Sequence, residues 1–215
     1  LKEAKEAGIP VFISDRRLDS PEDLYVTFIG SDFVEEGRMA GEWLATKMKG
    51  QARIAELVGK VGSAPANDRR DGFADVLTKN PGMKIIKSQT ANFERAKGKE
   101  VMEAFLKSPE GSQINALYAH NDDMAMGAIQ AIEAAGKKPG TDIIIVSVDG
   151  MRFAFDAIIE GKLNCTVECN PLLGPSIFDA IEKHLKGEKL EKNTVMKDRL
   201  FDDTTAKAEL PNRKY

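Results

Sequence analysis

The segment 114–136 constrains the fold most strongly, because it joins an apolar strand, a short polar turn and an amphipathic helix. Residues 114–119 form the strand-like run, and the apolar side chains that follow recur at helical spacing, at Ala125, Ala128, Ile129 and Ile132. Gly136 stands where a left-handed C-terminal cap would end this helix. Asn121 and Asp122 are both suitable N-caps, and we expect Asp122 to take that role. Such a turn lies at the carboxyl edge of a parallel sheet, where open α/β folds bind ligands.

The same alternation of strand and helix extends on both sides of this segment. Strand-like runs occupy residues 54–58, 84–88, 143–148 and 164–169, and helical patterns occupy residues 33–48, 68–78, 94–107 and 152–160. Strands separated by single helices favour right-handed crossovers and a parallel, doubly wound sheet. The chain is therefore predicted to be an α/β protein.

The two ends of the chain look like parts of a second α/β unit. They contain strand-like runs at 9–14 and 25–29, a helix that starts between Pro171 and Pro175 and runs through His184, and an extended segment at 194–201. The predicted organisation has three parts. Residues 1–30 and 171–197 belong to one lobe, residues 31–170 form the second lobe, and residues 198–215 are a C-terminal crossing segment.

The composition and the two cysteines exclude some functions. The 215 residues carry a formal net charge of -3, with Lys and Arg interspersed rather than clustered, so no nucleic-acid surface is expected. No apolar run approaches the ~20 residues that span a bilayer. The chain begins within a helical pattern and without Met, so we expect a signal peptide to lie outside this fragment. Cys165 and Cys169 are ~13 Å apart along a predicted strand, too far for a disulfide, and are expected to be small buried hydrophobes.

Polar and aromatic residues follow the ends of the predicted strands. Carboxylate, amide and guanidinium groups can form paired hydrogen bonds with adjacent hydroxyls. An aromatic ring can pack against the apolar face of a sugar. These groups predict a monosaccharide site that has no catalytic nucleophile and base. The candidate residues are Asp15, Arg16, Arg69, Phe93, Asn121 and Asp149.

Each candidate also has a simpler interpretation. Asn121 could be only a helix cap, Asp149 only a turn residue and Phe93 only a core residue, and the arginines could form solvated ion pairs. Their shared position at strand ends favours the site. Other chemistry has less support, because residues 59–63 lack P-loop spacing, His120 lacks metal-ligand spacing, and no Ser lies in a G-x-S-x-G context. We expect no metal, no cofactor and no enzymatic reaction.

Several segments resemble one family. The chain carries, in the order that the family has them, PVFISDR, NDRRDGF, NFERAKGKEVME, YAHNDDMAMGAIQAIEAAGKKPGTDIIIVSVDG and CTVECNP. This order resembles periplasmic sugar-binding proteins of the ribose- and galactose-binding type, which are the substrate-capture subunits of ABC importers. Within this family the chain is most similar to the galactofuranose-binding members, and the resemblance covers nearly all residues.

The resemblance implies two Rossmann-like lobes joined by three crossings that close on a sugar, near Gly30, Asn170 and Lys197. Asp15 and Arg16 would bind the sugar from the first lobe, and the other four candidates from the second. Further residues would precede the chain, so the first lobe would be incomplete. Ribose-binding relatives carry Gln where this chain has Cys169 beside Glu168, which disfavours ribose and makes Glu168 a further candidate contact.

The implied function is high-affinity, reversible capture of a monosaccharide, either galactofuranose- or galactose-like or a pentose. A periplasmic monomer would deliver it to a membrane permease. Two alternatives remain open. Effector domains of LacI-type transcription repressors share the fold and the N-D-x-M-A-x-G-A pattern, although the Asp-Gly at residues 149–150 favours transport over the Asp-Asp common in repressors. A sugar-modifying enzyme is the other alternative, and it would need a perturbed acid or base at the site.

Overall fold

The computed structural model describes all residues 1–215 and divides them into two compact units. Unit 1 contains Leu1–Asp32 and Asn170–Asp198, and unit 2 contains Phe33–Cys169 and Arg199–Tyr215. The chain therefore passes from one unit to the other three times. Both units are α/β structures, which confirms the predicted fold class.

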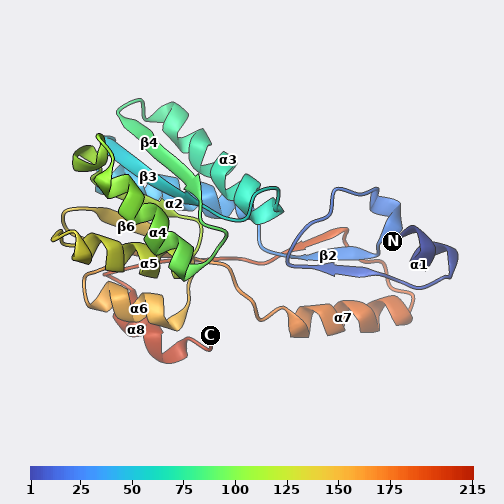
Figure 1. The fold of residues 1–215 in the computed structure, drawn as a ribbon. Coiled ribbons are helices and arrows are strands. Elements are labelled where there is room, and N and C mark those ends of the chain that lie inside the picture. The colour runs from blue at the N-terminus through green and yellow to red at the C-terminus, as the bar shows by residue number, and fades with distance from the viewer. The chain divides into compact units, whose positions relative to one another are not determined.

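Unit 2 is built on a six-stranded sheet with the order β4-β3-β5-β6-β7-β9 (Figure 1). The first five of these strands pair in parallel, and β9 is antiparallel to β7 at the edge. The parallel strands read as near-continuous apolar runs because helices cover both faces of the sheet. The strands are β3 (Ala52–Val58), β4 (Met83–Thr90), β5 (Ala116–Ala119), β6 (Ile144–Asp149), β7 (Cys165–Glu168) and β9 (Leu200–Asp202).

Six helices pack on this sheet and bury two apolar clusters, one on each face. Successive side chains of a strand point to opposite faces, so Leu117 and Ala119 of β5 belong to one cluster, and Ala116 and Tyr118 to the other. The helices α4, α5, α6 and α8 contribute to the first cluster, and α2 and α3 contribute to the second. The helices are α2 (Phe33–Lys47), α3 (Ala64–Lys79), α4 (Arg95–Lys107), α5 (Asp122–Ala134), α6 (Arg152–Ile159) and α8 (Ala206–Glu209).

A glycine brings α2 and α3 into close contact. A Cβ atom added to Gly37 would lie 2.1 Å from the carbonyl oxygen of Arg69, so no side chain fits at this position. This contact holds the backbone of α3 against α2 at Arg69, which is one of the candidate residues.

Unit 1 is smaller. Its three parallel strands have the order β1-β2-β8, and α7 packs against β1 and β2. Its elements are α1 (Lys2–Glu6), β1 (Phe12–Ser14), β2 (Thr27–Gly30), α7 (Gly174–Leu185) and β8 (Asn193–Val195). Short 3-10 turns lie at Glu22–Leu24 in this unit and at Gly111–Gln113 and Leu210–Asn212 in unit 2.

Three expectations from the sequence differ from the structure. The helix predicted at residues 68–78 begins at Ala64, because Pro65 in its first turn needs no hydrogen-bond partner for its nitrogen. The extended segment at 194–201 is two strands in two different sheets, β8 and β9. The sequence predicts that residues 198–215 are a crossing segment, but residues 199–215 belong to unit 2, where β9 pairs with β7 and α8 packs against α6.

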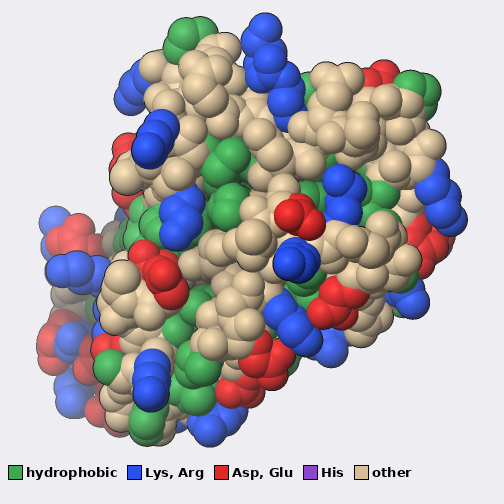
Figure 2. Space-filling model, turned by 90° about the vertical axis from the view of Figure 1, so that its left-hand side faces the viewer, with side chains coloured by type: hydrophobic (Ala, Val, Ile, Leu, Met, Phe, Trp, Pro, Cys, Tyr) green, Lys and Arg blue, Asp and Glu red, His purple; other side chains and the backbone are tan.

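The surface carries both signs of charge. On the face shown in Figure 2, Lys and Arg alternate with Asp and Glu, and apolar side chains form small separate patches. No helix is both long enough and apolar enough to cross a bilayer.

Candidate functional site

The five parallel strands of unit 2 run in the same direction, so their carboxyl ends lie together along one edge of the sheet, the carboxyl edge. Their register sets Val58 opposite Thr90, Leu57 opposite Ala119, and Asp149 opposite Glu168. The loops that follow β4, β5 and β6 therefore leave the sheet on the same side. Phe93, Asn121 and Asp149 lie on these loops, and Arg69 reaches the same edge from α3.

Arg69 connects the parts of this edge. Its guanidinium is buried and donates through Nε to Glu36 Oε2 at 2.6 Å and through Nη1 to the His120 carbonyl at 2.6 Å. Nη2 lies 3.6 Å from Asp149 Oδ1. Burial opposes the positive charge, but Glu36 and Asp149 outweigh it and raise the pKa of Arg69 above its usual value. A guanidinium has five N–H donors, so Arg69 retains donor capacity beyond these three partners.

Asp149 occupies an unusual backbone conformation. Its φ is 126°, a region that costs a non-glycine residue on the order of 1–3 kcal/mol. The side chain is 27% exposed. Burial raises the pKa of Asp149 well above its usual value, the Arg69 guanidinium acts against this, and the Asp122 carboxylate adds to it. The carboxyl group therefore combines partial access to solvent with a fixed cationic partner.

The expectation that Asp122 caps α5 is wrong, and its side chain points into the sheet instead. Its carboxylate accepts hydrogen bonds from Ser147 Oγ at 2.5 Å, Thr166 Oγ1 at 2.8 Å and the Met151 backbone N–H at 2.8 Å. Burial raises the pKa of Asp122 to about 6, although these three donors act against the shift. Asp122 thus lies in the interior and binds the turn on which Asp149 lies, through the Met151 N–H.

Asn121 is the N-cap of α5 and also fixes the loop that carries Phe93. Its Oδ1 accepts from the Met124 N–H at 3.0 Å, and its Nδ2 donates to the Phe93 carbonyl at 3.3 Å. One N–H of the amide remains for a ligand. Phe93 has a positive φ of 65°, and its half-buried ring lies against Gly59, where an added Cβ would be 2.0 Å from the ring.

His120 is part of the support beneath the site. The ring is buried, Nδ1 accepts from the Gly59 N–H at 3.4 Å, and Nε2 lies 3.3 Å from Glu56 Oε1. Burial lowers the pKa of His120, although Glu56 acts against the shift. Its backbone carbonyl, rather than its ring, serves the site by accepting from Arg69.

Strained backbone coincides with the candidate residues. Five non-glycine residues have a positive φ, and three of them are candidates, namely Asp15, Phe93 and Asp149. Such conformations persist where the surrounding structure imposes them, and they gather at ligand sites. The strain therefore supports the choice of these residues independently of the sequence.

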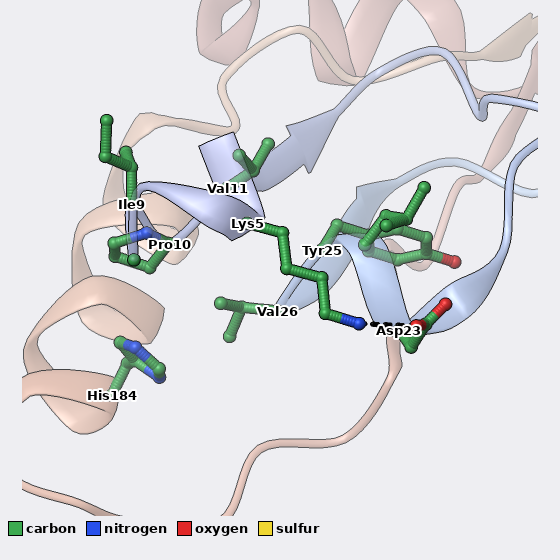
Figure 3. Close-up of a pocket in the computed structure, with 10 residues that line it drawn as sticks. Lys5, Ile9, Pro10, Val11, Asp23, Tyr25, Val26 and His184 are labelled. Carbon is green, nitrogen blue, oxygen red and sulfur yellow. Dashed lines mark hydrogen bonds and ion pairs between the residues drawn. The ribbon is translucent and has the colours of Figure 1, made fainter. Parts of the chain in front are cut away.

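Asp15 and Arg16 lie in unit 1, at the carboxyl end of β1. Asp15 donates its backbone N–H to the Ile29 carbonyl at 3.0 Å, and its exposed carboxylate lies 3.5 Å from Arg16 Nε. Unit 1 also contains a cavity of about 270 Å³ between α1, α7 and the start of β2 (Figure 3). Neither Asp15 nor Arg16 lines this cavity, which has Lys5, Asp23 and His184 in its wall.

Glu168 is engaged elsewhere. Its carboxylate accepts from Arg213 Nη1 at 2.6 Å and from the Tyr215 hydroxyl at 2.9 Å, and Arg199 lies 3.5 Å away. Oε1 thus accepts from two donors, and the buried carboxylate pairs with two arginines of unit 2. The sequence did not identify Glu36 and Asp122 as supports of the candidate site, because each of them acts through residues far away in the chain.

Comparison with known proteins places this geometry in a family. The chain matches the periplasmic binding protein domain over residues 1–189. It belongs to the periplasmic binding protein family. The galactofuranose-binding protein YtfQ of Escherichia coli (strain K12) is 46% identical over 218 residues, which cover 100% of this chain and 69% of YtfQ.

Solved structures of the family superimpose closely on this fold. The periplasmic binding component of the arabinose ABC transporter from Shewanella sp. ANA-3, bound to α- and β-L-arabinofuranose, has a TM-score of 0.94 and 50% identity over 99% of this chain and 71% of its own. A protein from Mycobacterium smegmatis in complex with β-D-fucofuranose has a TM-score of 0.94 and 52% identity over 100% of this chain and 71% of its own. The chain spans 60% to 69% of the length of the first curated relatives that it matches.

Proposed function

We propose that this chain is the sugar-binding part of an ABC importer's solute-binding protein and that its ligand is a monosaccharide in the furanose form. The observation that carries the proposal is the Arg69–Asp149 ion pair, at 3.6 Å, on the same sheet edge as Phe93. Asp149 and Phe93 are both held in strained conformations there. Asp15 and Arg16 of unit 1 are proposed as further contacts.

The chemistry of this edge suits vicinal hydroxyls. Asp149 accepts hydrogen bonds and Arg69 donates them, so a hydroxyl placed between them can satisfy both. Hydrogen bonds to charged groups contribute about 1.5–3 kcal/mol each, which makes the Arg69–Asp149 pair the main polar contribution to affinity. The Phe93 ring offers apolar surface to the CH groups of a sugar.

Three relatives favour a five-membered ring. YtfQ is named for galactofuranose, and the Shewanella and Mycobacterium structures contain L-arabinofuranose and β-D-fucofuranose. Since these proteins are 46% to 52% identical to this chain, a furanose is the ligand class to test first. The Shewanella protein is a component of an ABC transporter, and further relatives are named fructose and ribose import binding proteins, which favours transport over a repressor effector domain.

The proposed biological setting extends what the family supports. The protein would act in the periplasm as a monomer, without a cofactor or a chemical reaction, and would deliver the sugar to a membrane permease. The bound sugar should therefore leave unchanged. A proton NMR spectrum of the sugar after overnight incubation with the protein at its full encoded length checks this, and any product would contradict a binding role.

The experiment that tests the ligand class is a thermal-shift and calorimetry panel on the full-length protein. D-Galactose, L-arabinose and D-fucose each populate furanose forms, and a bound sugar raises the melting temperature by mass action. Methyl β-D-galactofuranoside and methyl β-D-galactopyranoside are the matched pair, because each is locked in one ring form. We expect the furanoside alone to stabilise the protein. Stabilisation by the pyranoside alone would overturn the furanose assignment and leave the sugar-binding role, whereas no shift with any sugar would overturn both.

A further inference from the structure

Arg213 is a buried arginine near the C-terminal end of this chain, and its side chain is only 4% exposed. Its guanidinium lies 4.9 Å from the ring centre of Phe155, 5.1 Å from that of Phe201 and 4.5 Å from that of Tyr215. Nη1 donates to Glu168 Oε1 at 2.6 Å. The ion pair and the three rings offset the desolvation cost of burying this charge.

The rest of the guanidinium binds one backbone carbonyl. Nε donates to the Gly150 carbonyl oxygen at 3.1 Å, and Nη2 donates to the same oxygen at 2.6 Å. Gly150 directly follows Asp149. Arg213 therefore binds the residue next to the strained aspartate of the proposed sugar site, although Arg213 and Gly150 are 63 positions apart in the chain.

Gly150 is shaped to accept this contact. Its φ is 73°, which favours glycine, and an added Cβ would lie 2.8 Å from Arg213 Nη2. The absence of a side chain thus serves both the turn and the approach of the guanidinium.

The remaining polar groups of the turn are also bonded. Thr166 Oγ1 accepts from the Gly150 N–H at 3.1 Å, Asp122 accepts from the Met151 N–H at 2.8 Å, and the Asp149 carbonyl accepts from the Cys169 N–H at 3.1 Å. The Gly150 carbonyl is the group that the C-terminal part of the chain controls. A strained residue keeps its conformation only while its surroundings impose it.

We propose that Arg213 is a positioning residue for the sugar site, which clamps the Gly150 carbonyl and thereby holds Asp149 in its binding conformation. This inference rests on the proposed function, because it assigns Asp149 to the sugar. Arg213 itself contacts no sugar. Loss of the clamp leaves the peptide between Gly150 and Met151 held only through its N–H, which donates to Asp122, and the carboxylate of Asp149 is less firmly held beside Arg69.

The test compares Arg213→Met with Arg199→Met in the full-length protein. Arg199 is the matched control, because its guanidinium also lies beside Glu168, at 3.5 Å, and over Phe201, at 4.8 Å. It does not contact Gly150. Arg213→Lys is a second variant, which keeps the charge beside Glu168 but lacks the planar fork that donates twice to one oxygen. If Arg213→Met does not fold, Arg213→Lys provides the comparison.

Two quantities are measured for each folded variant. Hydrogen exchange of the Gly150 and Met151 amides reports on the turn without any ligand, and calorimetry with D-galactose and L-arabinose gives the dissociation constant. We expect Arg213→Met to accelerate both amides and to weaken sugar binding about tenfold. Arg199→Met should change the dissociation constant by less than about twofold.

A double-mutant cycle with Asp149→Ala separates positioning from general stability. If Arg213 acts through Asp149, Arg213→Met should weaken binding by less than about twofold in the Asp149→Ala background. An equal loss in both backgrounds, or unchanged amide exchange, would overturn the inference while the sugar-binding function stands. If the wild-type protein binds neither sugar, the binding role of Arg213 is overturned together with the tested ligand class.

Discussion

The two units differ in how much apolar surface each buries. Unit 2 has an apolar cluster on each face of its sheet, whereas the buried apolar residues of unit 1 are few, namely Ile13, Phe28, Ile29, Leu173 and Ala180. Large apolar side chains that remain exposed gather in unit 1, which has seven of the nine, namely Leu1, Ile9, Leu18, Leu172, Phe178, Leu185 and Val195. Unit 2 therefore has the core needed to fold by itself, and unit 1 has much less.

This difference explains where strain can be kept. The conformations of Phe93 and Asp149 need rigid surroundings, and unit 2 supplies them through Asn121, Asp122 and Arg213. Asp15 in unit 1 also has a positive φ, but its side chain is 57% exposed and its partner Arg16 is exposed as well. We conclude that unit 2 holds a preorganised part of the proposed site.

The largest expected effect comes from two phenylalanines that differ in burial. Phe73 in α3 is fully buried, and its ring stacks on Tyr118 with centres 4.1 Å apart, whereas Phe178 in α7 is 69% exposed. Phe73→Ala should lower the free energy of unfolding by about 3–5 kcal/mol, because it leaves a cavity. Phe178→Ala should change it by less than about 0.5 kcal/mol.

Urea unfolding checks this pair by circular dichroism and by the fluorescence of Trp43. Trp43 is the one tryptophan, and it reports on unit 2 because its indole donates to Asp202 at 3.1 Å. If Phe178→Ala costs as much as Phe73→Ala, then Phe178 is covered in the natural protein and the contrast between the units is smaller than the structure indicates.

The next effect concerns buried acids, which unit 2 contains and unit 1 lacks. Burial raises the pKa of Asp122 to about 6, so the folded protein holds this proton more tightly than the unfolded chain does. The contribution of Asp122 to stability is therefore present at pH 4 and is lost as the pH rises through 6. It amounts to about 3 kcal/mol for a shift from 3.8 to about 6.

Asp122→Asn should remove this part of the pH dependence. The measurement is the free energy of unfolding at pH 4 and at pH 7, and the difference between the two should be smaller in the variant by up to about 3 kcal/mol. Asp123→Asn is the control for net charge, since Asp123 is the next residue and pairs with Arg95 at an exposed position. The same difference in wild type and Asp122→Asn would show that Asp122 is ionised in the fold at both pH values.

The strand ends could be predicted from the sequence, whereas the supports of the site could not. The alternation of apolar runs fixes where β5 and β6 end, and so it finds Asn121 and Asp149. The wrong assignment of Asp122 as the cap has a physical reason. Asn121 and Asp122 can both cap a helix. Asp122 does not do so because its carboxylate binds the hydroxyls of Ser147 and Thr166, which are 25 and 44 positions away in the chain.

The C-terminal part of the chain was beyond prediction for a similar reason. The strands β8 and β9 have three residues each, too few to show a period of two, and their pairing partners β2 and β7 are distant in sequence. Arg213 carries no local signal for a role at Gly150. Its partners become neighbours only when residues 199–215 fold onto unit 2.

The smallest expected effect is on sugar affinity, and it distinguishes the two strained aspartates, Asp149 of unit 2 and Asp15 of unit 1. Asp149→Ala should weaken sugar binding about 10- to 100-fold, because it removes a charged hydrogen-bond acceptor. Asp15→Ala should weaken it less than about tenfold, since an exposed carboxylate gains less from a fixed geometry.

Calorimetry on the full-length protein measures both changes with the sugar that gives the largest thermal shift. Asn tolerates a positive φ better than Ala does, so Asp149→Asn and Asp15→Asn separate the lost charge from a relaxed backbone. An unchanged dissociation constant in Asp149→Ala would remove Asp149 from the site. A larger loss in Asp15→Ala than in Asp149→Ala would reverse the comparison, because the unit with the smaller core would then contribute the stronger contact, and preorganisation by unit 2 would no longer account for affinity.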